Sequence, residues 1–342
     1  MAPVTRKTEV ERGGRLVTSY DVAEYAGVSQ SAVSRCFKPG ASVSKKMRER
    51  VMKAVDELGY QPNAIARGLI TRRSNIVAVI VSNLSVYPEV LSALSREFSE
   101  RGVRVLLFTI SRESDVRDII MQVLQYQVDG VVTAAHLDFS EVELFKRRGI
   151  PLVFFNRSYT DYGVSSVMCD QWGGEKVLVD LLLDNEHTNF AVIAGPADSV
   201  IATQRTEGAL RALKQRGIKR IASVAGDYGY DSGWQAALTL WRRKTQPSAI
   251  LCANDMMAFG VLDALRYELG VQVPQDVSVV GFDGTRAGRW ASFGLTTIRQ
   301  PVEQMAAAAV SLLLERVEEP GLGPEQRLFP GELIEGGTHR LA

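Results

Sequence analysis

The most constraining feature of this 342-residue chain is an alternation, from residue 76 onward, of apolar β-branched runs with amphipathic stretches of helical length. Continuous apolar runs are typical of strands that are buried on both faces. Strands of this kind separated by helices predict parallel sheets covered by helices on both sides. The expected strands are 76–81, 103–109, 130–133, 151–155, 190–194, 221–225, 249–253 and 277–282, and the expected helices are 90–101, 175–183, 207–216, 256–269 and 305–317.

The expected strands are too many for one comfortable sheet, so we predict two similar lobes. Ligands of parallel α/β sheets bind beyond the carboxyl ends of the strands. Asn156, Asn254 and Asp283 each follow an apolar strand there, and Arg205 is expected to start the helix after Gly195. A packed core does not need these polar groups, so they predict a ligand cleft between the lobes. The alternative is an internal Arg205–Asp283 salt bridge that braces the cleft, and an empty cleft could hold that pair too.

Residues 17–58 have a different pattern, in which short runs with helical spacing of apolar residues lie on either side of a glycine. Residues 20–25 carry apolar side chains at helical spacing, Gly27 interrupts the pattern, and Ser29 is placed to cap a second helix. A third helix is expected over 44–58, with one apolar face closing a small core. Two short helices around a glycine turn predict a helix-turn-helix, whose second helix can enter a DNA major groove. An ordinary αα-hairpin in a small helical bundle is the alternative.

Charge is distributed unevenly along the chain. Residues 1–75 contain 14 Lys and Arg against 7 Asp and Glu, whereas the remainder contains 26 against 32. This distribution is expected when the basic N-terminal segment binds the phosphates of a nucleic acid and the acidic remainder of the chain does not. A chance asymmetry of surface charge is the alternative.

Other classes of protein find little support in the sequence. No apolar run reaches the roughly 18 to 20 residues of a membrane span, and the first residues have no apolar signal region, so we expect a cytoplasmic protein. The three cysteines are scattered, without metal-ligand spacing, and are expected to be reduced thiols. The three histidines are far apart, and no phosphate-binding or nucleophile motif is present. We therefore predict no enzyme, no metal and no cofactor.

The segment that contains the helix-turn-helix resembles the headpiece of the LacI/GalR family of bacterial transcription regulators. The resemblance rests on Asp-Val-Ala at 21–23, Ala-Gly-Val-Ser at 26–29, Val-Ser-Arg at 33–35, Val-Ser at 43–44 and Leu-Gly-Tyr-Gln-Pro-Asn at 58–63. It continues through nearly the whole chain from Val17 onward. It implies an α/β protein with an N-terminal all-α helix-turn-helix headpiece and a periplasmic-binding-protein-like two-lobed core of parallel sheets flanked by helices.

The resemblance also implies a domain organisation. A disordered tail (1–16), a helix-turn-helix domain (17–63) and a hinge helix or linker (64–75) are expected to precede an effector-binding and dimerisation core (76–342). The N-terminal lobe is expected to hold about 76–169 and 300–327, and the C-terminal lobe about 170–299 and 328–340. The chain is expected to cross between the lobes near 169–170, 298–301 and 328.

By the same resemblance, the second headpiece helix reads DNA bases. Arginine and glutamine side chains suit the edges of guanine and adenine, and serine and lysine side chains suit phosphates. Leu69 is expected to wedge into the minor groove from the hinge. The expected DNA-binding residues are Ser29, Gln30, Ser31, Ser34, Arg35, Lys38, Asn63, Ala66 and Leu69.

The resemblance further implies a small effector in the cleft, and a carbohydrate fits the residues best. Arginine and aspartate side chains together can bind neighbouring hydroxyl groups through paired hydrogen bonds. Asp255 is expected to cap the next helix and not to touch the ligand. The expected effector-binding residues are Ser82, Tyr87, Asn156, Arg157, Arg205, Tyr228, Asn254 and Asp283.

Together these features predict a DNA-binding transcriptional repressor whose operator affinity is controlled allosterically by a sugar or sugar derivative. A homodimer on a pseudo-palindromic operator is expected, because residues 331–342 lack the heptad repeat of tetrameric relatives. A nucleobase, a sugar phosphate or a protein co-effector is the alternative within the regulator class. A solute-binding protein is the alternative from another class.

Overall fold

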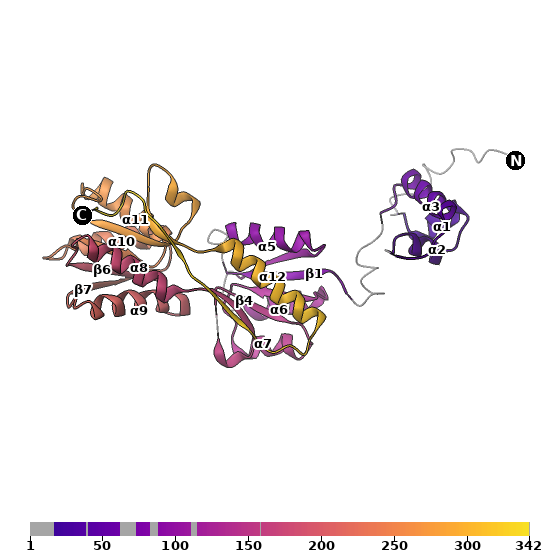
Figure 1. Cartoon of the computed structure of the whole chain (residues 1–342), viewed down its shortest axis with the longest axis horizontal. Helices are drawn as coiled ribbons and strands as arrows, with labels where there is room; N and C mark the ends of the chain where they lie inside the picture. The colour runs from indigo at the N-terminus through magenta and orange to yellow at the C-terminus, as the bar shows by residue number, and fades with distance from the viewer. Residues whose placement is uncertain are drawn as a thin grey trace. The chain divides into compact units, whose positions relative to one another are not determined.

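The computed structural model describes residues 17–38, 40–61, 73–82, 88–110, 115–157 and 159–341. The chain divides into two compact units, Met1–Ser74 and Asn75–Ala342 (Figure 1). Four residues predicted to bind DNA or effector lie outside the described ranges, namely Asn63, Ala66, Leu69 and Tyr87.

The first unit contains a helix-turn-helix followed by a third helix, which together we call the headpiece. Thr18 caps the first helix, and Gly27 ends it in the left-handed conformation (φ 58°). Ser29 and Ser44 cap the next two helices, as predicted. The apolar faces of all three helices meet in one buried cluster, which includes Val22, Val33 and Val51. The helices are α1 (Ser19–Ala26), α2 (Gln30–Cys36) and α3 (Lys45–Leu58).

The second unit is built on two six-stranded sheets, which define an N-lobe and a C-lobe. All strand pairs of the N-lobe sheet are parallel. Its strand order is β11 (Gln326–Phe329), β5 (Ser165–Cys169), β4 (Leu152–Phe155), β3 (Gly130–Thr133), β1 (Ile76–Val81) and β2 (Arg104–Thr109). The predicted parallel, helix-covered architecture is therefore confirmed for this lobe.

The C-lobe sheet is parallel except at one edge, where β12 runs antiparallel to β10. Its strand order is β12 (Glu332–Ile334), β10 (Thr296–Arg299), β9 (Ser278–Asp283), β8 (Ala249–Cys252), β6 (Phe190–Ala194) and β7 (Ile221–Ala225). The interiors of β8 and β9 are fully buried on both faces, which explains their continuous apolar sequences.

Helices cover both sheets, and one of them returns to the N-lobe late in the chain. α12 packs against α5 and against β3, β4 and β5. Figure 1 shows α12 beside α5 and β4. The helices of the N-lobe are α5 (Pro88–Glu100), α6 (Val116–Gln125), α7 (Phe139–Lys146) and α12 (Val302–Glu318). Those of the C-lobe are α8 (Gln171–Asp184), α9 (Val200–Gln215), α10 (Tyr230–Trp241) and α11 (Asp255–Asp263). Among the described residues, no helix is both long enough and apolar enough to cross a membrane.

Over the residues that the structure describes, the chain passes between the two sheets three times. It does so between β5 and α8, between β10 and α12, and between β11 and β12. A single buried apolar cluster includes Phe98 from the N-lobe and Phe190 and Phe282 from the C-lobe. The crossing segments therefore join two lobes that share part of their core.

One predicted helix is wrong in a way that matters for the site. The helix expected over 207–216 begins earlier, at Val200, where Ser199 caps it. Arg205 consequently lies in the second turn of α9 and does not start the helix. The first turns of α9 read Val-Ile-Ala-Thr-Gln-Arg, in which adjacent apolar residues are followed by polar ones. This order does not show the apolar spacing of an amphipathic helix.

Candidate functional site

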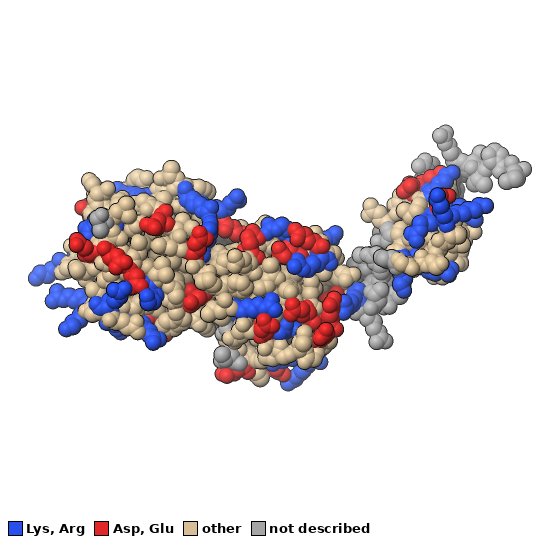
Figure 2. Space-filling model, in the orientation of Figure 1, with Lys and Arg blue, Asp and Glu red and all other residues tan. Residues whose placement is uncertain are grey.

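The outward face of α2 carries most of the side chains predicted to read DNA. The apolar side of α2 is buried in the headpiece core. This leaves Ser31, Ser34 and Arg35 exposed on the other side, and Lys38 is exposed just beyond the helix. Figure 2 shows Lys and Arg side chains gathered on the surface of the headpiece. An exposed polar helix face with a basic surround can enter a DNA groove.

Two of the predicted DNA contacts also hold the headpiece together. Ser29 Oγ accepts a hydrogen bond from Ala32 N (3.3 Å) and lies 3.0 Å from Ser31 Oγ. Gln30 is half-buried, and its Nε2 donates to Ser19 Oγ at 3.2 Å. These contacts fix the start of α2 against α1, so the predicted base-reading residues stand on a braced helix terminus.

The C-lobe holds a buried cation at the carboxyl edge of its sheet. The Arg205 guanidinium donates from Nη1 to Ala253 O (2.7 Å) and from Nε to Gln171 Oε1 (2.7 Å). Its Nη2 lies 2.9 Å from Asp283 Oδ1, with side-chain exposures of 3% for Arg205 and 20% for Asp283. The guanidinium carbon is 4.0 Å from the centre of the Phe282 ring. The salt bridge that was the alternative to ligand binding is thus formed, and the carboxylate remains partly open.

Three neutral side chains complete a closed circuit of hydrogen bonds with this ion pair. Asn156 Nδ2 donates to Gln300 Oε1 (2.9 Å), and Gln300 Nε2 donates to Asp283 Oδ1 (2.7 Å). Gln171 Nε2 donates to Asn156 Oδ1 at 3.1 Å, which returns the circuit to Arg205. We call these five residues the polar frame. Asn156 follows β4 of the N-lobe, so the frame joins the two lobes.

Three predicted effector-binding residues have a left-handed backbone. The φ angles are 52° for Asn156, 70° for Tyr228 and 130° for Asp283. Such backbones cost of order 1–3 kcal/mol in residues other than glycine, and they cluster at functional sites. Asn156 and Asp283 belong to the polar frame, while Asn75, Gln127 and Glu186 have the same kind of backbone elsewhere in the core.

Asn254 lies at the same edge but is fully engaged within the protein. It is 2% exposed, its Oδ1 caps α11, and its Nδ2 donates to Tyr228 O at 3.0 Å. The prediction that Asp255 caps α11 is wrong, because Asn254 takes that position one residue earlier. Asp255 accepts instead from Thr285 N (2.7 Å) and from Thr297 Oγ1 (2.6 Å).

The other predicted effector-binding residues are distributed over both lobes. Ser82 is exposed directly after β1. Arg157 is half-buried and donates from Nε to Ala134 O (2.8 Å), which lies just beyond the end of β3. The Tyr228 ring packs so closely on Gly195 that a Cβ atom there would come within 2.6 Å of it. The structure therefore brings Asn156, Arg205 and Asp283 together in one hydrogen-bonded frame.

The sequence did not single out Gln171, Gln300 or Glu175. The only available signal for the two glutamines was position, since both lie on or directly beside the segments expected to cross between the lobes. Glu175 carried no such signal, because a glutamate on an amphipathic helix is expected to face water.

Glu175 is a buried carboxyl group on α8, on the side that faces α9. It is 2% exposed, and its side chain touches Gly208, which lies near Arg205 on α9. Burial raises the pKa of Glu175 to about 8, and the Arg205 charge offsets part of this rise. The carboxyl is therefore mostly protonated at neutral pH.

Replacing Glu175 with glutamine is expected to flatten the pH dependence of stability. Because the folded pKa of Glu175 lies above the ordinary value of 4.5, the folded state binds more protons than the unfolded state between the two values. The wild type should lose up to about 1.4 kcal/mol per pH unit over this range, and the variant should not. Urea unfolding from about pH 5 to 9 measures this, with Glu207→Gln, an exposed site on α9, as the control. Equal pH slopes for wild type and Glu175→Gln would contradict it.

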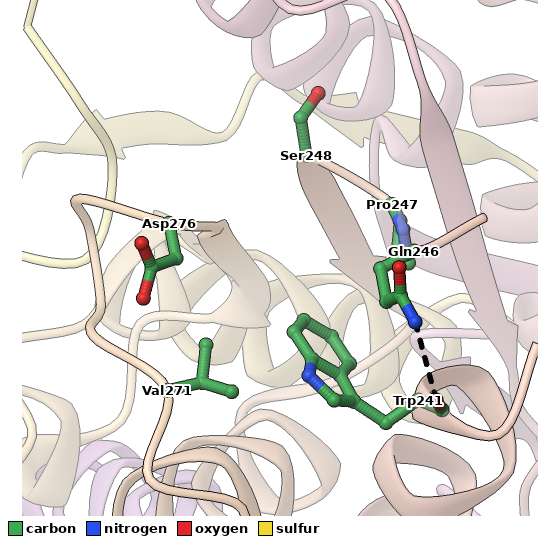
Figure 3. Close-up of a pocket in the computed structure, with 6 residues that line it drawn as sticks. All are labelled: Trp241, Gln246, Pro247, Ser248, Val271 and Asp276. Atoms are coloured by element: carbon green, nitrogen blue, oxygen red, sulfur yellow. Dashed lines mark hydrogen bonds between the residues drawn. The ribbon is translucent and has the colours of Figure 1, made fainter. Parts of the chain in front are cut away.

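A separate pocket lies at the opposite end of the C-lobe sheet. Figure 3 shows its lining residues, and its volume is about 330 Å³. Ser248 directly precedes β8, so this pocket is at the amino edge of the sheet. No predicted site residue lines it. The lining residues are Trp241, Gln246, Pro247, Ser248, Val271 and Asp276.

Within the described parts of the chain, no group of three or more His, Cys, Asp or Glu side chains is arranged to hold a metal ion. Cys36, Cys169 and Cys252 are buried free thiols.

Comparisons with known proteins place both units. Residues 18–63 match the model of bacterial regulatory proteins of the lacI family, and residues 179–339 match the periplasmic binding protein-like domain. The ribose operon repressor of Escherichia coli K12 is 30% identical over 331 residues, covering 94% of this chain and 100% of the repressor. The regulator CelR of Thermobifida fusca is 33% identical over 308 residues, covering 86% of this chain and 90% of that protein.

Solved structures are similar over the same extent. A lac repressor dimer bound to operator and the anti-inducer ONPF has a TM-score of 0.86 at 30% identity, covering 95% of this chain and 99% of that chain. The complex of CelR with cellobiose has a TM-score of 0.71 at 30% identity, covering 94% and 99%. With whole-length relatives at this identity and both domain types matched, the chain belongs to the lacI family of bacterial regulatory proteins.

Proposed function

We propose that this chain is a cytoplasmic transcriptional repressor whose operator affinity is set by a sugar or sugar derivative bound at the polar frame. The observation that carries the proposal is the Arg205–Asp283 pair at the carboxyl edge of the C-lobe sheet, which Gln300 links to Asn156 of the other lobe. This edge is where parallel α/β sheets bind their ligands. Two of the relatives cited above are repressors by name, CelR is named a transcriptional regulator, and none of these names denotes an enzyme.

The chemistry of the frame suits a polyol. The guanidinium can donate to one hydroxyl oxygen while the carboxylate accepts from the neighbouring hydroxyl group. Arg205 already has its charge balanced by Asp283, so the pair offers directed hydrogen bonds without demanding a charged guest. Two relatives point the same way, since one repressor is named for the ribose operon and CelR has been solved in complex with cellobiose.

The headpiece supplies the operator contacts of the proposal. The exposed face of α2 would enter the major groove, with Arg35 and Gln30 toward the bases and Ser29, Ser34 and Lys38 toward the phosphates. A lac repressor relative binds its operator as a dimer. A homodimer of this chain would place one headpiece in each half of a pseudo-palindromic operator.

Control of DNA binding by the sugar requires two states with different sugar affinity. A guest that contacts Asn156 and the Arg205–Asp283 pair touches both lobes, so its binding energy depends on how the lobes are placed. The segment 64–75 links the N-lobe to the headpiece, and a change of lobe placement in a dimer would alter the separation of the two headpieces.

Two alternatives fit less well. A nucleobase effector is disfavoured because the family resemblance implies an extra arginine shortly before Arg205 for purine binding, and residues 197–200 contain none. A solute-binding protein would have no use for a helix-turn-helix headpiece.

A thermal-unfolding screen tests the sugar part of the proposal. Purified protein is heated with neutral pentoses, hexoses and disaccharides, including ribose, lactose and cellobiose. A bound guest stabilises the folded state by about 2.7 kcal/mol at 100 times its dissociation constant, which raises the unfolding temperature. At least one sugar should do so. A protein that no sugar stabilises at saturating concentrations would contradict a carbohydrate effector.

A further inference from the structure

The polar frame contains one residue whose amide N–H groups are both in use, Gln171. Gln171 is 1% exposed, and both of its amide N–H groups are used, one toward Asn156 Oδ1 (3.1 Å) and one toward Cys169 O (3.0 Å). Its carbonyl oxygen accepts from Arg205 Nε at 2.7 Å. Because a primary amide has only two N–H groups, Gln171 cannot donate to a sugar without giving up one of these contacts.

The direction of every hydrogen bond in the frame is fixed by its two charged members. Arginine can only donate and an ionised aspartate can only accept, so Gln171 must turn its oxygen toward Arg205 and its nitrogen toward Asn156. Asn156 therefore turns its Oδ1 toward Gln171, where Oδ1 also accepts from Cys169 N (3.3 Å). Its Nδ2 then faces Gln300 and donates to it. Gln300 in turn donates to Asp283. One orientation of all three amides satisfies the whole circuit.

Gln171 also occupies a distinctive place in the chain. It is the first residue of α8, directly after the crossing segment that leaves β5 of the N-lobe. Asp170 caps the same helix through a hydrogen bond to Gly173 N (2.9 Å). The position of Gln171 is therefore tied to the first of the three connections between the lobes.

We propose that Gln171 is a positioning residue of the effector site, which holds Arg205 of the C-lobe and Asn156 of the N-lobe in one hydrogen-bonded frame without touching the guest. The inference rests on the proposed sugar site. Because Gln171 fixes Arg205 and Asn156 relative to each other, a guest that contacts Arg205 always finds Asn156 in the same position. Binding of the guest therefore depends on both lobes. Without Gln171, Asn156 and Arg205 stay linked only through Gln300 and Asp283. The two side chains are then held less firmly, and the guest must order them at a cost in affinity.

The test compares wild type, Gln171→Met, Asn156→Ala and the double variant as full-length proteins. The readout is the concentration of ribose, lactose or cellobiose that half-maximally changes binding of a fluorescent duplex selected by the wild type. Gln171→Met should raise this concentration by about 10- to 50-fold relative to wild type. In the Asn156→Ala background, the same change should add less than about threefold, because Gln171 acts through Asn156.

Matched variants separate positioning from loss of structure. Gln215→Met, on the exposed end of α9, should leave the half-maximal concentration unchanged. Gln171→Glu keeps the shape of the side chain and the contact to Arg205 but supplies no N–H to Asn156. It should also weaken sugar binding, and it replaces Gln171→Met should the methionine variant not fold.

The unliganded protein tests the frame independently. The loss of thermal stability in the double variant should be smaller than the sum of the two single losses. Additive losses, or a Gln171 variant with wild-type sugar response, would overturn the proposal. A wild-type protein that binds DNA but answers to no sugar contradicts the proposed function instead, and the unfolding data alone then decide whether the frame exists.

Discussion

Replacing Asp283 with alanine is expected to abolish the sugar response while leaving the headpiece able to bind DNA. Asp283 is the only acidic member of the polar frame, and it accepts from both Gln300 and Arg205. Hydrogen bonds to charged groups contribute about 1.5–3 kcal/mol each, so losing those made to the guest should weaken sugar binding by about 100-fold or more. Calorimetry measures the sugar affinity, and fluorescence anisotropy on a selected duplex measures the DNA affinity.

Loss of folding must be separated from loss of the contact. Removing the carboxylate leaves the buried Arg205 without its counter-ion, and alanine at a φ of 130° is strained. Asp283→Asn keeps the shape and should still bind sugar much more weakly than wild type, while Asp231→Ala, at an exposed site in α10, should bind normally. Loss of DNA binding with normal sugar affinity in the folded Asp283 variants would be the opposite of this expectation.

Replacing Arg35 with alanine is expected to have the reverse effect. Arg35 is exposed on the face of α2 that is proposed to enter the major groove. A bidentate contact to one base pair contributes about 1–3 kcal/mol of discrimination, and a dimer makes it twice, so affinity for the selected duplex should fall by about 30-fold or more. Sugar affinity, measured by calorimetry, should not change.

Two lysine positions calibrate that result. Lys38→Ala removes a proposed phosphate contact, so it should weaken binding to all duplexes alike and reduce the salt dependence of binding. Lys53→Ala, on an exposed face of α3 where Lys53 pairs with Glu57 (3.9 Å), should have little effect. An Arg35→Ala protein that still distinguishes the selected duplex from a scrambled one would refute the proposed role of α2.

The strands that the sequence predicted best are those with the simplest composition. The strands β1, β3, β6 and β7 have the predicted limits, because each is an apolar run bounded by turn residues. The strands β5 and β10 were not predicted, since serine and threonine occupy buried positions in them. Ser165 Oγ accepts from Glu325 N (3.1 Å), and Thr297 Oγ1 donates to Asp255. These hydrogen bonds satisfy the serine and threonine hydroxyl groups and so allow them to be buried. The bonding partners are distant in sequence, so the local pattern could not predict this burial.

The candidate site was predictable only in part for the same reason. Asn156 and Asp283 could be found because each follows a clear strand, and carboxyl ends of parallel strands meet at one edge. Gln171 is recognised by its side-chain bond to Asn156, 15 residues away, and Gln300 by its side-chain bond to Asp283, 17 residues away. A single glutamine gives no signal of such bonds in the local sequence. The burial of Glu175 depends on the packing of α8 against α9, which a glycine at position 208 permits.

The most direct test of the account is the affinity of the full-length protein for its selected duplex, measured by anisotropy with and without a sugar that raises its unfolding temperature. Tight binding to the selected duplex is expected, with a change of about tenfold or more at saturating sugar and no such change in Asp283→Ala. A duplex affinity that stays the same across the full range of sugar concentrations would contradict the account, as would a protein that binds no duplex even at low ionic strength.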